Sequence, residues 1–151
     1  MQDFTDQDGG YKRISSSRYA AYSFSMTARD LARFGWLYLN HGRWGNRSVV
    51  PETWVRDSTH PWPDAKPGVA YGLLWWVSTA EWQFGTTVGF GSYSARGAGG
   101  QFLVVLPAYN MVVVHLCDTK SRSRTSLDCS KDNSDFGRIL KAILAAQPGG
   151  Q

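Results

Sequence analysis

The sequence predicts an α+β fold, in which a mainly antiparallel sheet of four to five strands packs against an N-terminal and a C-terminal helix. Two segments, near Thr27 and near Phe136, have apolar residues at helical spacing. Between them the pattern changes to short runs rich in aromatic and β-branched residues, which are typical of strands. The chain has 151 residues, 42% of them hydrophobic, enough for one domain with a buried core. A multidomain protein and a wholly disordered chain are both excluded.

The first helix is predicted to begin after a polar segment. Residues 1–24 are expected to be a partly ordered lead-in, and residues 3–17, rich in Gly and Ser, to be loop. Thr27-Ala28-Arg29-Asp30 has the Ser/Thr-x-x-acid form of a helix start, and Asn40-His41-Gly42 ends the pattern. The apolar face of this helix consists of Leu31, Phe34, Gly35 and Tyr38.

A short second helix and a loop are expected next. Pro51-Glu52-Thr53-Trp54-Val55 places proline at a first helical position beside an acid, which favours a helix start. Residues 61–68 contain three prolines and a glycine, and are therefore predicted to be irregular.

The second half of the chain is predicted to supply the sheet and its cover. The expected strands are Tyr71–Val77, Trp82–Phe90, Phe102–Leu106 and Met111–Leu116, the last two forming a hairpin. Because these runs are apolar at nearly every position, both faces of the sheet should be covered. One cover is a final helix, with Phe136, Ile139, Leu140, Ile143 and Leu144 on one face. Residues 25–147 are expected to form the domain and residues 148–151 a tail.

The charge pattern indicates a solvated surface more than a polyanion site. The net charge is +4, and the cations gather loosely in residues 12–47 and 120–141 without an uninterrupted basic tract. A basic binding module is therefore only a third hypothesis, and nucleic acid is not an expected partner. The acidic, polar N-terminus lacks a signal peptide and no apolar run could span a membrane, so a soluble, cytoplasmic chain is expected, although full-length relatives can be exported.

The cysteines and histidines suggest no metal or cofactor. Cys117 and Cys129 lie twelve positions apart, a spacing that fits no zinc motif. Two free thiols and one loop-closing disulfide both stay open. The histidines, His41, His60 and His115, have no metal spacing, and a Ser-His-Asp triad built from them is not expected.

Four segments, in order, resemble a known family. Ser25–Trp44, Val50–Val55, Tyr71–Val77 and Gly97–Pro107 are similar to the later half of serine hydrolases of the β-lactamase and penicillin-binding-protein superfamily. The likeness is to the class C β-lactamase-like esterases and 6-aminohexanoate-dimer hydrolases, and it extends from about Met26 to the final helix. It implies the C-terminal half of the β-lactamase-like fold.

The resemblance also implies a mechanism and a set of site residues. Such enzymes use a Ser-x-x-Lys nucleophile, a Tyr-x-Asn proton relay and a third element on an inner strand beside the nucleophile. Only the third element is found, and the residues assigned to it are Arg96, Gly97, Ala98, Gly99, Gly100 and Gln101. The Ala98 N–H is the candidate for one of two oxyanion donors, small residues let the substrate approach, and Arg96 could meet a substrate carboxylate.

The nucleophile itself is missing. None of the five lysines has serine three positions earlier, so Ser-x-x-Lys does not occur. Tyr38-Leu39-Asn40 matches Tyr-x-Asn by letter, but Tyr38 lies on the apolar face of the first predicted helix and is expected in the core. The serines at positions 15–17, 121, 123 and 126 are expected to be loop hydroxyls, and the tryptophans mainly core residues.

Two hypotheses of function follow. In the first, the chain is a truncated β-lactamase-like hydrolase without activity of its own. In the second, a partner chain supplies Ser-x-x-Lys, and an amide, ester or β-lactam bond is cleaved only in the complex. Without the remaining fold elements, a strand edge and apolar surface would stay open, so a homodimer or domain-swapped dimer is also predicted.

Overall fold

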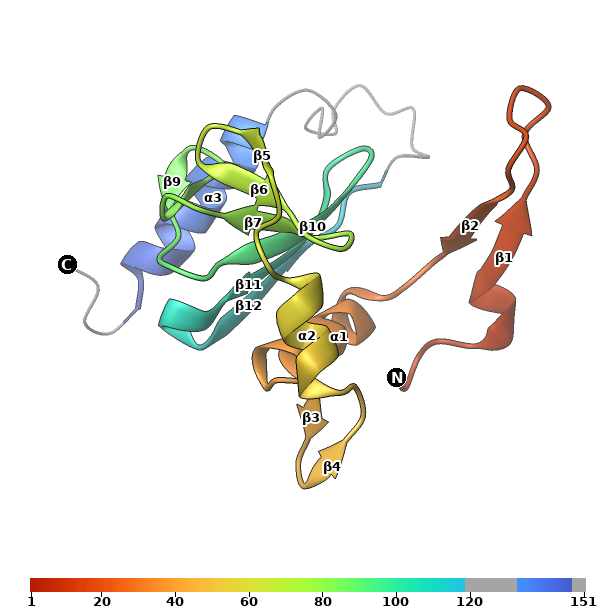
Figure 1. Cartoon of the computed structure of the whole chain (residues 1–151), viewed down its shortest axis with the longest axis horizontal. Coiled ribbons are helices and arrows are strands. Elements are labelled where there is room, and N and C mark those ends of the chain that lie inside the picture. The colour runs from red at the N-terminus through yellow and green to blue at the C-terminus, as the bar shows by residue number, and fades with distance from the viewer. Residues whose placement is uncertain (119–132, 148–151) are drawn as a thin grey trace.

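The computed structural model describes residues 1–118 and 133–147 (Figure 1). Its centre is an antiparallel six-stranded sheet with the order β12-β11-β10-β7-β6-β5. The α+β class is therefore confirmed, with one or two strands more than predicted. The strands are β5 (Asp64–Lys66), β6 (Val69–Tyr71), β7 (Trp76–Ser78), β10 (Tyr93–Gly97), β11 (Gln101–Leu106) and β12 (Met111–His115), and the helices are α1 (Ala28–Leu39), α2 (Glu52–Ser58) and α3 (Asn133–Ala145).

Both faces of the sheet are covered, as the sequence predicts. Side chains alternate along β11, so Phe102, Val104 and Leu106 lie in one core with residues of α3. Leu103 and Val105 point to the opposite face and lie in a second core with residues of α1 and α2. From Phe102 to Leu106, β11 is buried at every position. The sheet therefore separates two hydrophobic cores.

Helix α1 begins and ends where the sequence predicts. The Thr27 hydroxyl accepts a hydrogen bond from the Asp30 N–H at 3.2 Å. After Leu39, His41 and Gly42 have positive φ angles of 53° and 82°, which stop the helix before the small hairpin β3 (Arg43–Trp44) and β4 (Arg47–Ser48). A Cβ at Gly35 would lie 2.6 Å from Val112 and 2.7 Å from Leu103, so glycine is what lets α1 approach the sheet.

Two predicted strands are wrong in detail, because each is interrupted by a turn. Residues 71–77 are divided between β6 and β7, and Leu74 between them has a positive φ of 70°. The Leu73 N–H donates to the Ser58 carbonyl at 2.8 Å, which fixes this turn against the end of α2. Residues 82–90 form only the short hairpin of β8 (Trp82–Gln83) and β9 (Thr86–Thr87), with positive φ at Phe84 and Gly85. Neither interruption has a strong turn motif in the sequence.

Two segments predicted to be irregular contain strands. In the proline-rich residues 61–68, β5 occupies the three positions between Pro63 and Pro67, at the edge of the sheet where proline is tolerated. Within the lead-in, a 3₁₀ turn (Asp6–Asp8) precedes the hairpin of β1 (Gly9–Lys12) and β2 (Ala21–Phe24). Figure 1 shows this hairpin extending away from the sheet.

The predicted β11–β12 hairpin and the predicted final helix are both present, and most of the helix residues expected in the core are buried. Strands β11 and β12 are joined by a 3₁₀ turn (Pro107–Tyr109). In α3, Phe136, Leu140 and Leu144 are buried, but Ile139 is 46% exposed, since it lies on the flank of the buried stripe that faces solvent. Among the described residues, no helix is long and apolar enough to cross a membrane. Cys129, the serines at 121, 123 and 126, and the predicted tail lie outside the described residues.

The buried carboxylate of Asp30 ties the N-terminal residues to α1. It accepts hydrogen bonds from the main-chain N–H groups of Gln2 and Asp3 at 3.0 and 2.9 Å, and from Arg33 at 2.6 Å. Burial alone raises the pKa of Asp30, but the hydrogen bonds from Gln2, Arg33 and Asp3 outweigh it and lower the pKa to about 2. The ionised carboxylate is therefore the form that stabilises the fold.

We expect Asp30→Asn to lower the free energy of unfolding at pH 7. The free energy of unfolding should also change less with pH below about pH 4 in the variant than in the wild type. Because the folded pKa lies below the ordinary value of 3.8, the carboxylate contributes fully above about pH 4, and this contribution is lost as the pH falls toward 2. Urea unfolding at a series of pH values measures both effects. Asp57→Asn, at an exposed ion pair with Arg56, is the control and should change little. Equal behaviour of the two variants would contradict the role given to Asp30.

Candidate functional site

The six residues assigned to the substrate strand lie together at one end of the sheet, but only part of them is strand. Arg96 and Gly97 end β10, Gln101 begins β11, and Ala98, Gly99 and Gly100 form the turn between them. Gly99 and Gly100 have φ angles of 76° and 79°, a conformation that glycine adopts at little cost. The candidate oxyanion donor at Ala98 thus lies in a tight turn, here called the glycine turn (residues 97–100).

Two side chains from β11 and β12 hold the glycine turn in place. The Nδ1 atom of His115 lies 2.7 Å from the Gly100 carbonyl oxygen. Because a carbonyl only accepts hydrogen bonds, His115 must carry a proton on Nδ1 here. The Gln101 side chain donates to the Cys117 carbonyl at 2.7 Å and accepts from the Cys117 N–H at 3.1 Å. Cys117 is itself disulfide-bonded.

Arg96 is half-buried on the α3 side of the sheet, among polar and aromatic groups. Its guanidinium donates to Ser94 Oγ and to Gln83 Oε1, both at 3.0 Å. The guanidinium carbon lies 4.2 Å from the ring centre of Phe84 and 5.4 Å from that of Trp76. Burial lowers the pKa of Arg96 to about 10, so the side chain stays charged near neutral pH.

No carboxylate among the described residues neutralises this charge. The ion pairs formed within residues 1–118 and 133–147 involve other arginines. Gln83, almost fully buried, also keeps its Nε2 donor without a partner in that part of the chain. The environment of Arg96 therefore offers hydrogen-bond donors and positive charge.

Sequence reasoning missed Gln83, Ser94 and His115 as neighbours of the site. Ser94 is two positions before Arg96 on the same strand, so their shared face follows from strand geometry. The other two contacts depend on folding. Gln83 reaches Arg96 from the β8–β9 hairpin, and His115 lies opposite Phe102 across the β11–β12 pair. No sequence pattern links either residue to residues 96–101.

The other candidate side chains do not assemble a catalytic group in the described residues. Tyr38 is buried among Phe34 and Trp75, and Asn40 donates to the Trp36 carbonyl at the helix end, so Tyr-x-Asn has a core and capping role here. His41 and His60 line a separate cavity of about 610 Å³, which His115 does not line. The serines at positions 15–17 are exposed in the connection between β1 and β2.

Comparisons with known proteins agree with this architecture. The model of the β-lactamase family matches residues 3–129. Among solved structures, the fold is similar to that of a protein described as a 6-aminohexanoate-dimer hydrolase from Bacillus anthracis, with a TM-score of 0.57 and 26% sequence identity. The match covers 82% of this chain and 29% of that hydrolase. A search of curated proteins gave no match. Since the family match spans well over half of the residues and includes the glycine turn, the chain belongs to the β-lactamase family.

Proposed function

We propose that the chain supplies the oxyanion side of a β-lactamase-like serine hydrolase, and that these 151 residues do not catalyse acyl transfer alone. The observation that carries the proposal is the combination of a braced glycine turn with the complete absence of Ser-x-x-Lys from the sequence. Stabilisation of the oxyanion thus has a candidate site in this chain, whereas the nucleophile and its activating lysine have no candidate residues.

The glycine turn suits the stabilisation of a developing negative charge. Gly97 and Ala98 are exposed at the end of the sheet, where a substrate could approach the main chain. Main-chain N–H groups fixed in a rigid turn are preorganised and need no rearrangement during the reaction. In this proposal the Ala98 N–H is one of two oxyanion donors, and the other belongs to the nucleophile.

Arg96 is proposed to attract a substrate carboxylate. The guanidinium has five N–H donors, and only two of them are engaged by the contacts with Ser94 and Gln83. Arg96 immediately precedes the glycine turn in the sequence, and the ion pairs among the described residues involve other arginines. A substrate with an amide, ester or β-lactam carbonyl and a nearby carboxylate would fit this arrangement.

A partner that brings Ser-x-x-Lys is the route to activity that we propose. The chain spans less than a third of the hydrolase it resembles, which supports the idea that further fold elements complete the site. Self-association is a separate proposal. Strand β12 is five residues long, rich in valine, and lies at the edge of the sheet in the described part of the chain, where a second copy could pair.

Mass spectrometry after treatment with a fluorophosphonate tests the proposed function. We expect no stoichiometric adduct on any serine of this chain alone, since none has an activating lysine. When a polypeptide with Ser-x-x-Lys is bound, the adduct should appear on the serine of that polypeptide. An adduct mapped to a single serine of the 151-residue chain would reveal a nucleophile of its own and overturn the proposal.

A further inference from the structure

The β1–β2 hairpin carries a continuous row of aromatic rings on one face. Tyr11 pairs with Tyr22 across the two strands, with ring centres 5.0 Å apart, and Tyr22 contacts Phe24 at 6.0 Å. Phe4 extends the row by an edge-on contact with Phe24 at 6.5 Å. Together these four residues form what we call the aromatic face.

The body of the molecule leaves this face uncovered. Tyr11, Tyr22 and Phe24 are 76%, 55% and 58% exposed. Figure 1 shows the hairpin extending from the N-terminal end of α1, away from the sheet. A two-stranded hairpin is marginally stable in water unless its apolar face packs against something. The rings therefore need a covering surface that residues 1–118 and 133–147 do not provide.

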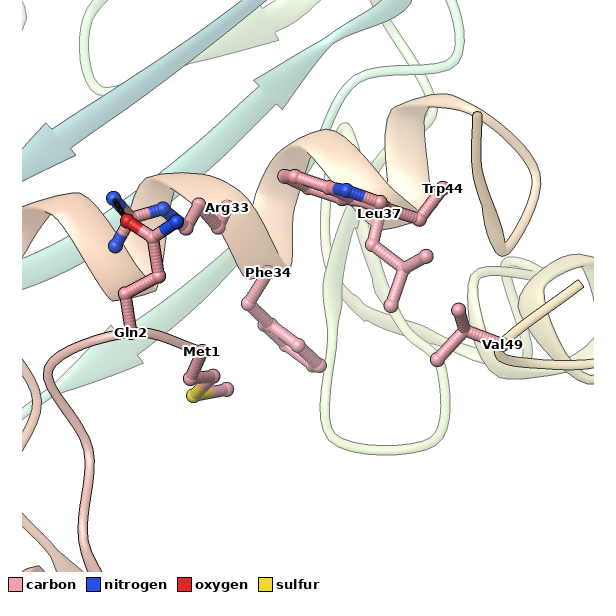
Figure 2. A pocket seen from close by; sticks show the side chains of 7 residues that line it. All are labelled: Met1, Gln2, Arg33, Phe34, Leu37, Trp44 and Val49. Carbon is pink, nitrogen blue, oxygen red and sulfur yellow. Dashed lines mark hydrogen bonds between the residues drawn. The ribbon is translucent and has the colours of Figure 1, made fainter. Parts of the chain in front are cut away.

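An apolar groove lies next to the aromatic face. It has a volume of about 250 Å³, and Figure 2 shows its lining side chains converging beside α1. A hydrogen bond of 2.6 Å from Arg33 to Gln2, drawn in Figure 2, holds the N-terminal residues at its rim. The N-terminal residues link the groove to the aromatic face, because Met1 lines the groove and Phe4 belongs to the aromatic face. The three residue steps from Met1 to Phe4 span at most about 11 Å. The apolar lining residues are Met1, Phe34, Leu37, Trp44 and Val49.

The family comparison indicates what covers this surface. The β-lactamase match includes residues 9–24, so the hairpin lies within the region that the family model describes. Most of the related hydrolase has no counterpart in this chain. A second copy is a poor occupant, because residues 9–24 contain Lys12, Arg13 and Arg18 and no acid, and two such hairpins would repel each other.

We infer that the aromatic face and the adjoining groove are the docking surface for the Ser-x-x-Lys-bearing portion of a β-lactamase-like hydrolase, carried by another polypeptide. This inference rests on the proposed function and identifies the surface through which the partner binds. The occupant inserts apolar side chains against the rings and into the groove. Around them it carries acidic residues that face the three cations of the hairpin.

Co-expression with the part of the Bacillus anthracis hydrolase that lies outside the structural match tests the inference. We expect a one-to-one complex by light scattering. Replacing the rings together, by Tyr11→Ser, Tyr22→Ser and Phe24→Ser, should weaken binding by about 100-fold or more, since buried aromatic anchors dominate interface energies. Tyr19→Ser is the matched control, because Tyr19 is equally exposed in the same hairpin but has no ring contact with the aromatic face. It should change the affinity by less than about threefold.

The outcomes separate the inference from the proposed function. Equal affinity of the triple variant and the wild type would overturn the docking surface, even if the serine of the partner is acylated. Binding that depends on the rings, without any acylation, would support the surface and refute the proposed function. Failure to form a complex, or a homodimer that the triple variant abolishes, would also overturn the inference. The triple variant should melt like the wild type, because its residues lie in neither core.

Discussion

In the complex with a Ser-x-x-Lys partner, Ala98→Pro is expected to lower kcat/KM for a short-chain nitrophenyl ester by about 10²- to 10³-fold. Proline has no N–H, so the substitution removes the proposed oxyanion donor and adds little volume. The φ angle of Ala98 is not among the positive ones, which the ring of proline would forbid. The loss should appear mainly in kcat, because the donor acts on charge that develops in the transition state.

The control for this experiment is Ala98→Gly, which keeps the N–H and should retain most of the activity. Similar activities of the proline and glycine variants would show that the Ala98 N–H donates nothing to the reaction. Binding of the partner should be the same for both variants, since Ala98 is far in sequence from the hairpin and belongs to neither core. Measuring affinity and rate on the same samples separates assembly from chemistry.

Gly137→Ala is expected to destabilise the fold by about 3 kcal/mol. Gly137 is buried in α3, and a Cβ at this position would overlap the main-chain carbonyl oxygen of Phe84. A side chain could rotate away from the new methyl group, but a carbonyl in the turn between β8 and β9 cannot. The helix must therefore move off the sheet and expose part of the core that contains Phe136 and Leu140.

Urea unfolding of Gly137→Ala and Gly10→Ala measures this effect with a matched pair. Gly10 is exposed in β1, has no positive φ, and a Cβ there would have no neighbour within 4 Å. Its replacement should change the free energy of unfolding by less than about 0.5 kcal/mol. Comparable destabilisation by the two substitutions would mean that α3 does not pack on Phe84 as described.

The elements that were predictable are those whose signals lie close together in the sequence. The start of α1 follows from Thr27 and Asp30, three positions apart, and the β11–β12 hairpin follows from two apolar runs with a short link. The β1–β2 hairpin was missed because its defining pair, Tyr11 and Tyr22, is separated by ten residues, most of them polar, without a strand pattern. The break before β7 was missed because Leu74 adopts a positive φ that leucine rarely has.

The same distinction applies to the candidate site. Family resemblance suggested residues 96–101 as the candidate site, and these residues lie at one end of the sheet. It could not identify the groups that surround them. The contact between His115 and Gly100 exists only because β12 pairs with β11 in one register, and Gln83 reaches Arg96 only after the β8–β9 hairpin has folded. Such neighbours are properties of the fold and not of any local segment.

Strand β11 limits which changes of chain length this protein can accept. Its successive side chains enter different cores, Phe102 and Val104 on the side of α3, Leu103 and Val105 on the side of α1. Substitution by another apolar residue affects one core at a time. Deletion or insertion of a single residue would instead transfer every following side chain to the opposite face, and both cores would lose their partners together. Variation in length should therefore be confined to the turns at its two ends, and one of those is the glycine turn.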